Sequence, residues 1–203
     1  TIIIISFFLS FYLPISDQIY IIDFGFIKLK FMCDIYSYFF GILVVIVWFL
    51  AILYTYSYQK LNIYRSKATS FFKYLSLSIF AVLGNGYAAD LWTLFIFYNL
   101  LILFTSPLII QRVSKASVNA LKYYLVTHSI TTLLFFLPAI ILLQKFSGGV
   151  DFIENNNSYM AENTKFAAFL LFLFIMGISK NCILPFNKWL VRVTIAPTPI
   201  SGL

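Results

Sequence analysis

The sequence predicts an all-α fold: a polytopic bundle of transmembrane helices with a broken helix near the C-terminal end. Of the 203 residues, 62% are hydrophobic and 10% are charged, and the mean hydropathy is +0.93. Soluble domains average roughly 45–50% apolar and about 25% charged residues. Apolar runs long enough to cross a bilayer recur along the chain, and a segment with several prolines follows the last run. One globule cannot bury this much apolar surface, so we expect an integral membrane protein.

A helix needs about 20 mostly apolar residues to cross the hydrocarbon core of a bilayer. Five segments satisfy this requirement, at residues 34–57, 71–88, 90–110, 120–143 and 166–184. The second and third segments form one long apolar stretch, which Gly84, Gly86 and Asp90 divide into two helices joined by a tight hairpin. Asp90 is expected to cap the N-terminus of the second of these helices.

Residues 1–33 are expected to hold part of a first span and an external loop, and residues 34–203 one membrane domain. Within the loop, the partly alternating stretch from Ile19 to Phe31 predicts a β-hairpin. The chain opens inside an apolar run and stops shortly after the prolines. We therefore interpret it as part of a longer protein whose true start has been lost, left by natural truncation, a split gene or fragmentation.

Charged residues separate into two sides when the five spans are drawn. One side holds basic residues and no acid: Lys60, Arg65, Lys67, Lys73, Arg112, Lys115, Lys122, Lys188 and Arg192. All seven acidic residues fall on the opposite side or at its edge: Asp17, Asp23, Asp34, Asp90, Asp151, Glu154 and Glu162. By the positive-inside rule the basic loops face the cytoplasm, or the matrix if the membrane is mitochondrial.

The chain lacks the sequence features of several other classes of protein. Its net charge of +7 comes from short loops and not from one basic face, which argues against a nucleic-acid partner. The two cysteines, Cys33 and Cys182, form no CxxC pair and have no neighbouring histidine, so we expect no metal site. We also expect no cofactor and no redox chemistry in this chain, because it has no cofactor ligands and no Gly-rich phosphate loop.

Lys180 is the most informative residue, because it is the only charge in the apolar run from Phe166 to Leu184. A lone charge at membrane depth costs about 2.5–3.5 kcal/mol on insertion scales and usually marks an ion or proton pathway. Three prolines that break helical structure follow it: Pro185, Pro197 and Pro199. A lysine beside a broken helix is typical of transporter sites, and a desolvated lysine can load and release a proton. The alternative is a structural lysine bonded to carbonyls of the broken helix.

Two further residues are candidates for a proton pathway. Lys122 stands at the start of the segment 120–143, where it either takes part in proton transfer or snorkels and anchors the orientation of the helix. His128, within the same segment, is a candidate because an unperturbed histidine side chain changes charge near neutral pH. A single polar residue at such a position more often makes a helix–helix hydrogen bond, so both interpretations stay open.

Three sequence motifs resemble a known family. M-G-I-S-K-N-C-I-L-P-F-N-K-W-L (Met176 to Leu190), followed by A-P-T-P-I-S-G-L, is similar to the pattern G-x-x-K-x-x-x-x-P-F-H-x-W-L…A-P-T-P-x-S. Two upstream segments are similar to further motifs of the same family: D-L-W-T-L-F-I-F-Y-N-L-L-I-L-F-T-S-P-L-I (Asp90 to Ile109) and A-L-K-Y-Y-L (Ala120 to Leu125). The pattern belongs to the antiporter-like membrane subunits shared by multisubunit Na⁺/H⁺ antiporters and NADH–quinone oxidoreductase. The Thr-Ser-Pro-Leu sequence at residues 105–108 favours the antiporter D-like branch.

The resemblance runs from about Asp34 to Leu203 and implies the first inverted repeat of the antiporter-like fold, truncated. It also implies a proton route through an acid paired with Lys122, then Lys180, then later lysines. Two residues depart from the family pattern: Asn99 replaces its intramembrane glutamate, and Asn187 replaces the histidine of P-F-H-x-W-L. Lys122 therefore lacks a charged partner within the membrane that the sequence identifies.

Two functions are consistent with these observations. The first is a membrane subunit that contributes to proton or monovalent-cation translocation in a multisubunit Na⁺/H⁺ antiporter or NADH–quinone oxidoreductase complex. Its partners would be other membrane subunits, the lipid bilayer, and protons or Na⁺. The second is a truncated or split, non-transporting remnant that acts at most as a membrane scaffold. The expected location is the bacterial inner (plasma) membrane or, alternatively, the mitochondrial inner membrane.

The charge pattern predicts the outcome of cysteine labelling in a chain whose own cysteines are replaced by serine. An impermeant maleimide added to intact cells should modify a cysteine placed at Asn155, in the expected external loop 144–165. It should leave a cysteine placed at Arg65, in a basic loop, unmodified. The reverse pattern would overturn the predicted orientation.

Overall fold

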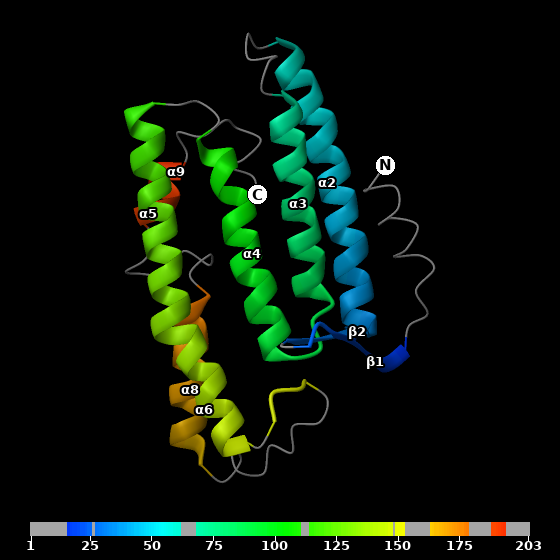
Figure 1. Cartoon of the computed structure of the whole chain (residues 1–203), viewed down its shortest axis with the longest axis vertical. Coiled ribbons are helices and arrows are strands. Elements are labelled where there is room, and N and C mark those ends of the chain that lie inside the picture. Colours follow the sequence, from blue (N-terminus) through cyan, green and yellow to red (C-terminus); the bar gives the residue numbers. More distant parts are fainter. Residues whose placement is uncertain are drawn as a thin grey trace.

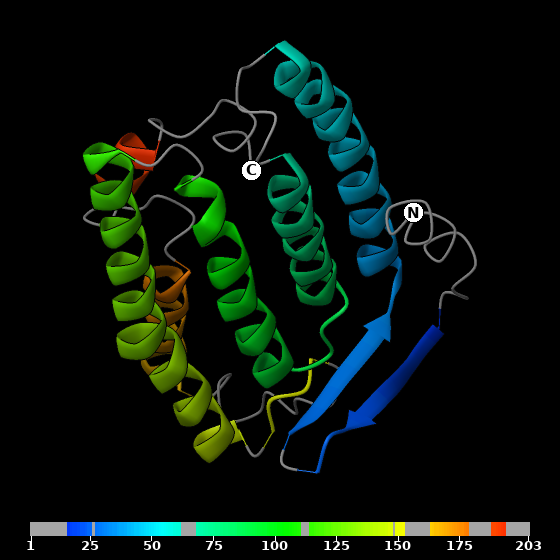
Figure 2. The ribbon, with the colours of Figure 1, turned by 45° about the horizontal axis from the view of Figure 1, so that its top comes forward.

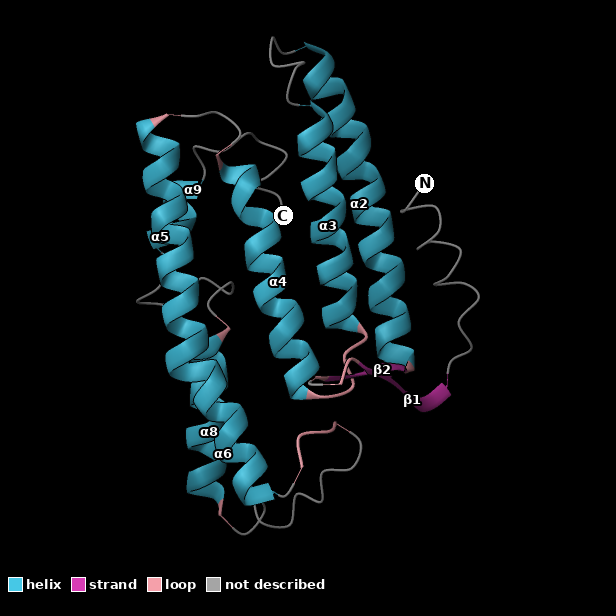
Figure 3. Cartoon of the chain, in the orientation of Figure 1, coloured by secondary structure: helices cyan, strands magenta, loops and turns pink. Residues whose placement is uncertain are grey.

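The computed structural model describes residues 16–25, 27–61, 68–110, 114–147, 149–152, 163–178 and 188–193. In chain order the helices are α2 (Ile35–Leu61), α3 (Ala68–Gly86), α4 (Leu91–Ile109), α5 (Lys115–Thr131), the π-helix η2 (Thr132–Phe136), α6 (Leu137–Ser147), α8 (Thr164–Gly177) and α9 (Lys188–Val193). Two strands, β1 (Ser16–Asp23) and β2 (Lys28–Cys33), precede them (Figure 3). The predicted helix bundle is therefore confirmed.

The helices stand in two neighbouring groups (Figures 1 and 2). α2, α3 and α4 form one row, and the continuous helix made by α5, η2 and α6 lies beside α4, with α8 and α9 packed against it. One hydrophobic core runs through both groups and includes Trp48 of α2, Leu75 of α3, Tyr98 of α4 and Leu170 of α8. The first residues of α3 and α5 lie at one end of the bundle and the strands lie at the other, as the separation of charges requires (Figure 1).

The two strands form the predicted β-hairpin. They pair antiparallel, with Tyr20 opposite Phe31. The turn between them contains Gly25 at a φ of 83°, a conformation that glycine adopts without steric cost. Phe31 also forms an isolated β-bridge with Ala88, in the connection between α3 and α4. The hairpin is thus joined through its second strand to the end of the helix bundle.

The long apolar stretch 71–110 is divided between α3 and α4 near the residues that the sequence indicates. The Asp90 carboxylate accepts a hydrogen bond from the Thr93 N–H at 2.9 Å, which confirms Asp90 as the N-cap of α4. Gly84 allows α3 and α4 to approach each other closely. A Cβ atom at this position would lie 2.1 Å from the ring of Phe97, so any other residue would have to displace that ring or move the helices apart.

The helix that contains residues 120–143 starts earlier than the hydrophobic pattern predicts. A capping box fixes its start: Ser114 Oγ accepts from the Ser117 N–H at 3.0 Å, and Ser117 Oγ accepts from the Ser114 N–H at 2.9 Å. This reciprocal pair satisfies two backbone donors that otherwise have no intrahelical partner. Because the box uses serine at both positions, it does not match the usual Ser/Thr-x-x-Glu/Gln pattern.

The middle of the same helix widens into η2, which the hydrophobic pattern does not predict. The Leu137 N–H bonds to the Thr132 carbonyl, five residues earlier. Pro138 follows directly, and a proline has no N–H and clashes with the carbonyl four residues before it. A wider turn just before Pro138 relieves this clash, so the helix continues to Ser147 without a break.

Among the described helices, three are long and apolar enough to cross a membrane: Ile35–Tyr56, Leu91–Ile109 and Lys115–Phe146. The other two expected spans, 71–88 and 166–184, overlap α3 and α8, which are not among these three. α3 carries several polar side chains, among them Ser76 and Ser78, whose hydroxyls donate to carbonyls one turn earlier. α8 has 14 residues and stops short of the expected end at residue 184, because Ile178 leaves the helical conformation with φ −85° and ψ 67°.

The buried position of Cys33 in β2 predicts slow alkylation. Only 3% of Cys33 is exposed. Burial raises the pKa of the Cys33 thiol and the adjacent Asp34 carboxylate raises it further, so little of the reactive thiolate is present near neutral pH. In a Cys182→Ser variant, iodoacetamide should modify Cys33 at least roughly tenfold more slowly than a cysteine placed at Ile21, which is exposed on β1. Equal rates, followed by mass spectrometry of the intact protein, would contradict this placement of the strand.

Candidate functional site

The leading candidate residues lie outside the described part of the chain: Lys180, Pro185, Pro197 and Pro199. The structure does describe the two helices that flank Lys180 in sequence. α8 ends at Gly177 and α9 begins at Lys188. Both pack against the continuous helix made by α5, η2 and α6. The two contacts therefore place the helices that precede and follow residues 179–187.

The first contact joins the end of α8 to η2. A Cβ atom at Gly177 would lie 2.8 Å from the N, Cα and Cβ atoms of Phe136, closer than real Cβ contacts allow. Two of these three atoms belong to the backbone, so no side-chain rotation relieves the clash. One turn before Gly177, the Phe174 ring lies 5.9 Å from the Phe136 ring, measured between centroids. Glycine at position 177 is thus required for this close approach.

The second contact joins α9 to α5 through three rings, Tyr124, His128 and Trp189, which we call the aromatic triad. Their centroids are 4.4 Å apart for Tyr124–His128, 4.7 Å for His128–Trp189 and 5.6 Å for Tyr124–Trp189, all edge to face. His128 is 0% exposed and Trp189 is 8% exposed. Aromatic pairs in this geometry contribute about 0.5–1.5 kcal/mol each beyond their buried area. The triad therefore fixes α9 on the surface of α5.

Contacts on either side extend the triad to other elements. The Arg192 guanidinium lies 3.3 Å from the centroid of the Tyr123 ring, a cation–π contact that also joins α9 to α5. The hydroxyl groups of Tyr124 and Thr105 share a hydrogen bond of 2.7 Å. Since Thr105 belongs to α4, the triad is connected to the first helix group as well as to α9.

The π-helix begins a few residues after His128. The Thr131 and Thr132 hydroxyls donate to the His128 carbonyl at 3.0 and 2.8 Å. These side chains supply donors where the backbone changes from α-helical to π-helical bonding. Single-turn π-helices are frequent at functional sites. His128 thus lies at the junction of an irregular backbone with a buried ring cluster.

Asn99 and Lys122 are not brought together. The Asn99 side-chain amide donates to the Phe95 carbonyl at 2.8 Å, one turn earlier in its own helix. Lys122 is exposed on α5, two residues before Tyr124, and thus on nearly the opposite face of α5 from the side that contacts α4. Within the described ranges, no hydrogen bond or ion pair joins Asn99 to Lys122.

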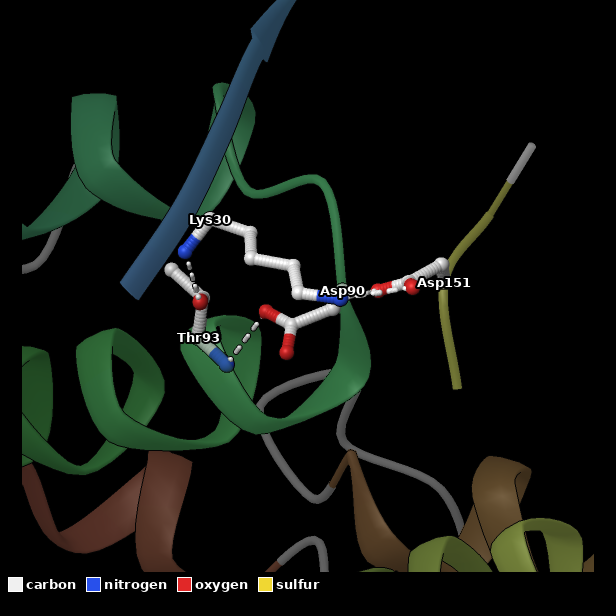
Figure 4. Close-up of polar contacts among 4 residues, drawn as sticks. All are labelled: Lys30, Asp90, Thr93 and Asp151. Carbon is white, nitrogen blue, oxygen red and sulfur yellow. Dashed lines mark hydrogen bonds and ion pairs between the residues drawn. The ribbon is translucent and has the colours of Figure 1, made fainter. Parts of the chain in front are cut away.

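A second polar arrangement lies where the hairpin meets α4, and we call it the hairpin-side cluster: Lys30, Asp90, Thr93 and Asp151 (Figure 4). Lys30 Nζ lies 2.7 and 2.6 Å from the two carboxylate oxygens of Asp151. The backbone N–H of Lys30 donates to Thr93 Oγ1 at 2.9 Å. With Asp90 as the cap of α4, the cluster ties together β2, α4 and residues 149–152.

The sequence singles out His128 but gives no sign of most residues around it. The spacing of Tyr124 and His128 places both on one helix face. Trp189 belongs to the motif that contains Lys180, yet nothing in the sequence indicates that it packs on His128. Lys30 and Asp151 are 121 residues apart, so their pairing is likewise decided by the fold.

Chains of two solved complexes have a similar fold. A chain of the Mrp complex from Dietzia sp. DQ12-45-1b matches with a TM-score of 0.81 and 17% identity, covering 99% of this chain and 22% of that chain. A chain of the membrane-bound sulfane sulfur reductase, an archaeal respiratory membrane complex, matches with a TM-score of 0.74 and 18% identity, covering 98% of this chain and 40% of that chain. Identities this low show a shared fold and no more.

Two relatives, from Staphylococcus haemolyticus and Staphylococcus saprophyticus, carry the name antiporter subunit mnhA2. Each is 26% identical over 180 residues, which cover 87% of this chain and 22% of the relative. The chain therefore spans about a fifth of the length of these relatives. Their names do not mention the D-like branch that the Thr-Ser-Pro-Leu sequence favours. The assignment of this chain to the D-like branch therefore stays a prediction.

The fold and the apolar helices define a membrane-embedded, partial antiporter-like helix bundle. A family model described as "NADH:quinone oxidoreductase/Mrp antiporter, TM" matches residues 88–203, from just before α4 onward. This match covers more than half of the chain. The chain belongs to the NADH:quinone oxidoreductase/Mrp antiporter transmembrane family, as its sequence motifs predict.

The Lys30–Asp151 pair should matter more for stability than the exposed Lys28–Asp23 pair. The side chains of Lys30 and Asp151 are 27% and 13% exposed, against 66% and 51% for Lys28 and Asp23, whose charges are 3.6 Å apart. Removing one partner of a partly buried pair leaves a charge without its compensation. Asp151→Ala should lower the free energy of unfolding by about 1–3 kcal/mol.

The matched control is Asp23→Ala, which should lower the free energy of unfolding by about 0.2–1 kcal/mol. Thermal unfolding of the detergent-solubilised protein measures both variants. An equal effect of the two substitutions would show that the hairpin-side cluster does not contribute more than an exposed ion pair.

Proposed function

We propose that this chain forms part of a membrane subunit that contributes to proton or monovalent-cation translocation in an Mrp- or NADH–quinone oxidoreductase-type complex. The observation that carries the proposal is the family match over residues 88–203, because that range includes Lys180, Lys122 and His128. The fold of the described helices supports it, since chains of an Mrp complex and of a respiratory membrane complex share that fold.

In this proposal Lys180 is the titrating group. It is the single charge in an apolar run, and in this proposal it exchanges its proton with whichever side of the membrane is open to water. Lys122 and His128 are the further candidates for the route. Asn99 cannot change charge, so the acid that pairs with lysine in the family pattern has no titrating equivalent at this position. No cofactor or metal takes part in this mechanism, and any redox reaction belongs to other chains.

The partners in the proposal are other membrane subunits, because the solved structures with this fold are multisubunit complexes. The location that we propose is the bacterial inner membrane, consistent with the bacterial relatives, with the mitochondrial inner membrane as the alternative. The second function, a non-transporting membrane scaffold, is favoured by one observation: the Asn99 amide is bonded within its own helix at the position of the family's acid.

Substitution of Lys180 distinguishes the two functions. In inverted membrane vesicles that contain the assembled complex, Lys180→Ala should reduce proton translocation at least roughly a hundredfold, as expected when the central titrating group of the proposed route is removed. Lys165→Ala is the matched control, since Lys165 is an exposed lysine in the first turn of α8. This control should retain the rate of the unmodified complex.

The measurement is the pH change reported by a fluorescent amine after substrate or Na⁺ is added to the vesicles. Membrane abundance of the subunit, followed on immunoblots, confirms equal assembly. Equal translocation by Lys180→Ala and the unmodified complex would contradict the proposed role in translocation and favour the non-transporting scaffold.

A further inference from the structure

We propose that a groove on α3 binds an anionic phospholipid, with an acyl chain in the groove and the headgroup phosphate beside Lys73. The groove has a volume of about 580 Å³. The described residues that line it all belong to α3: Phe72, Lys73, Ser76, Leu77 and Phe80. Sites for small ligands measure about 300–1,000 Å³, so this groove has room for part of a lipid. The proposal does not depend on ion translocation by the chain.

The hollow in the groove results from a small side chain between two large ones. Phe72, Ser76 and Phe80 follow one another at intervals of four residues, so they stand in one row on α3. The Phe72 ring packs edge to face on Phe71, with centroids 5.9 Å apart, and the Phe80 ring packs in the same way on Phe97 of α4 at 5.6 Å. Both rings are therefore held, and the space over Ser76 exists before a ligand binds.

The side chains in the groove suit a hydrocarbon chain. Ser76 Oγ donates to the Phe72 carbonyl at 2.9 Å, so its proton is already bonded within the helix. An acyl chain that covers Ser76 thus leaves no donor without a partner. Leu77 and the two phenylalanine rings supply apolar walls. Phe80 is 55% exposed, and a lipid chain in the groove would cover its ring.

The position of α3 in the bundle places the groove at membrane depth. α3 lies between α2 and α4 and packs against both, and each of these neighbours is long and apolar enough to cross a bilayer (Figure 1). Lys73 is in the second turn of α3, near the end of the bundle that is opposite the hairpin. Phe80 lies about 10 Å further along the helix, at a rise of 1.5 Å per residue. The groove therefore runs inward from the region of the lipid headgroups.

The charge of Lys73 determines which lipids the groove favours. Lys73 is exposed and is the only charged residue among the described residues that line the groove. α3 contains no acidic residue, and the ion pairs in the described part of the chain use Lys28 and Lys30 instead. The Lys73 ammonium is thus available to a phosphate group. Basic side chains at the membrane surface attract lipids whose headgroups carry a net negative charge.

Photocrosslinking tests the proposal. The assembled complex is reconstituted in phosphatidylcholine vesicles that contain a small fraction of a lipid with a diazirine in its acyl chain, either phosphatidylglycerol or phosphatidylcholine. After irradiation, mass spectrometry quantifies the label on the peptide that contains Ser76 and Phe80. The phosphatidylglycerol probe should label this peptide roughly fivefold more than the phosphatidylcholine probe, the preference expected from one lysine near the surface.

Substitutions of Lys73 test the role of its charge. Lys73→Gln should bring the labelling by the two probes to within about twofold of each other, whereas Lys73→Arg keeps the charge and should preserve the preference. Lys115→Gln is the matched control, because it removes an exposed lysine from the first turn of α5 at the same end of the bundle, and it should leave the preference unchanged. An equal effect of Lys73→Gln and Lys115→Gln would show attraction by the general surface charge alone and would overturn the proposal.

A substitution that fills the hollow tests the groove itself. Ser76→Phe leaves Lys73 in place and should lower labelling by phosphatidylglycerol to the level of the phosphatidylcholine probe. Ile46→Phe, at a position on α2 that is 50% exposed, is the matched control and should label like the unmodified complex. Unchanged labelling in Ser76→Phe, or equal labelling of the unmodified complex by the two probes, would overturn the proposal. No labelling by either probe would show that another subunit covers the groove, and this result would overturn it as well.

Discussion

Phe136 is the point at which the two helix groups meet, and much of the structure depends on its packing. Its ring contacts Phe95 and Tyr98 of α4 at 5.6 and 5.9 Å, and Phe174 of α8 at 5.9 Å. Its backbone faces Gly177 at a distance that leaves no room for a side chain. A helix–helix contact without side chains between the backbones is common in membranes, where close packing replaces the hydrophobic driving force. The π-helical turn that ends at Phe136 brings the ring and the backbone to these two neighbours at once.

The remaining contacts divide between two ends with different chemistry. At the hairpin end, the charged and capped groups Lys30, Asp90 and Asp151 join elements that are far apart in the sequence. Around α5 and α9, aromatic rings and hydroxyl groups take this role. The Lys30–Asp151 ion pair is only partly buried and each charge has its partner, whereas an unpaired charge at membrane depth is expensive. Lys180, which the sequence places in an apolar run, is the exception and for that reason the candidate for function.

The sequence predicts several features because they depend on local pattern or on composition. The Asp90 cap follows from an acid placed directly before an apolar helix, and the hairpin follows from the partial alternation between Ile19 and Phe31. Other features are not predictable in this way. The serine capping box departs from the usual residue pattern. The π-helix η2 results from the position of Pro138 within a sequence whose hydrophobic pattern otherwise predicts one regular α-helix. α8 ends at Gly177 because Ile178 adopts a non-helical conformation, and the neighbouring residues in the sequence do not predict this end.

The sequence by itself determined that this protein is a membrane helix bundle, which family it belongs to, and that Lys180 is an unusual charge, because composition and linear motifs carry that information. The tertiary structure decided which side chains lie together. It set His128 between Tyr124 and Trp189, and it separated Asn99 from Lys122. These outcomes depend on helix rotation and close approach, and a single glycine or a single π-helical turn changes both. A pattern of apolar residues fixes which segments become helices, but the faces that meet are chosen by packing.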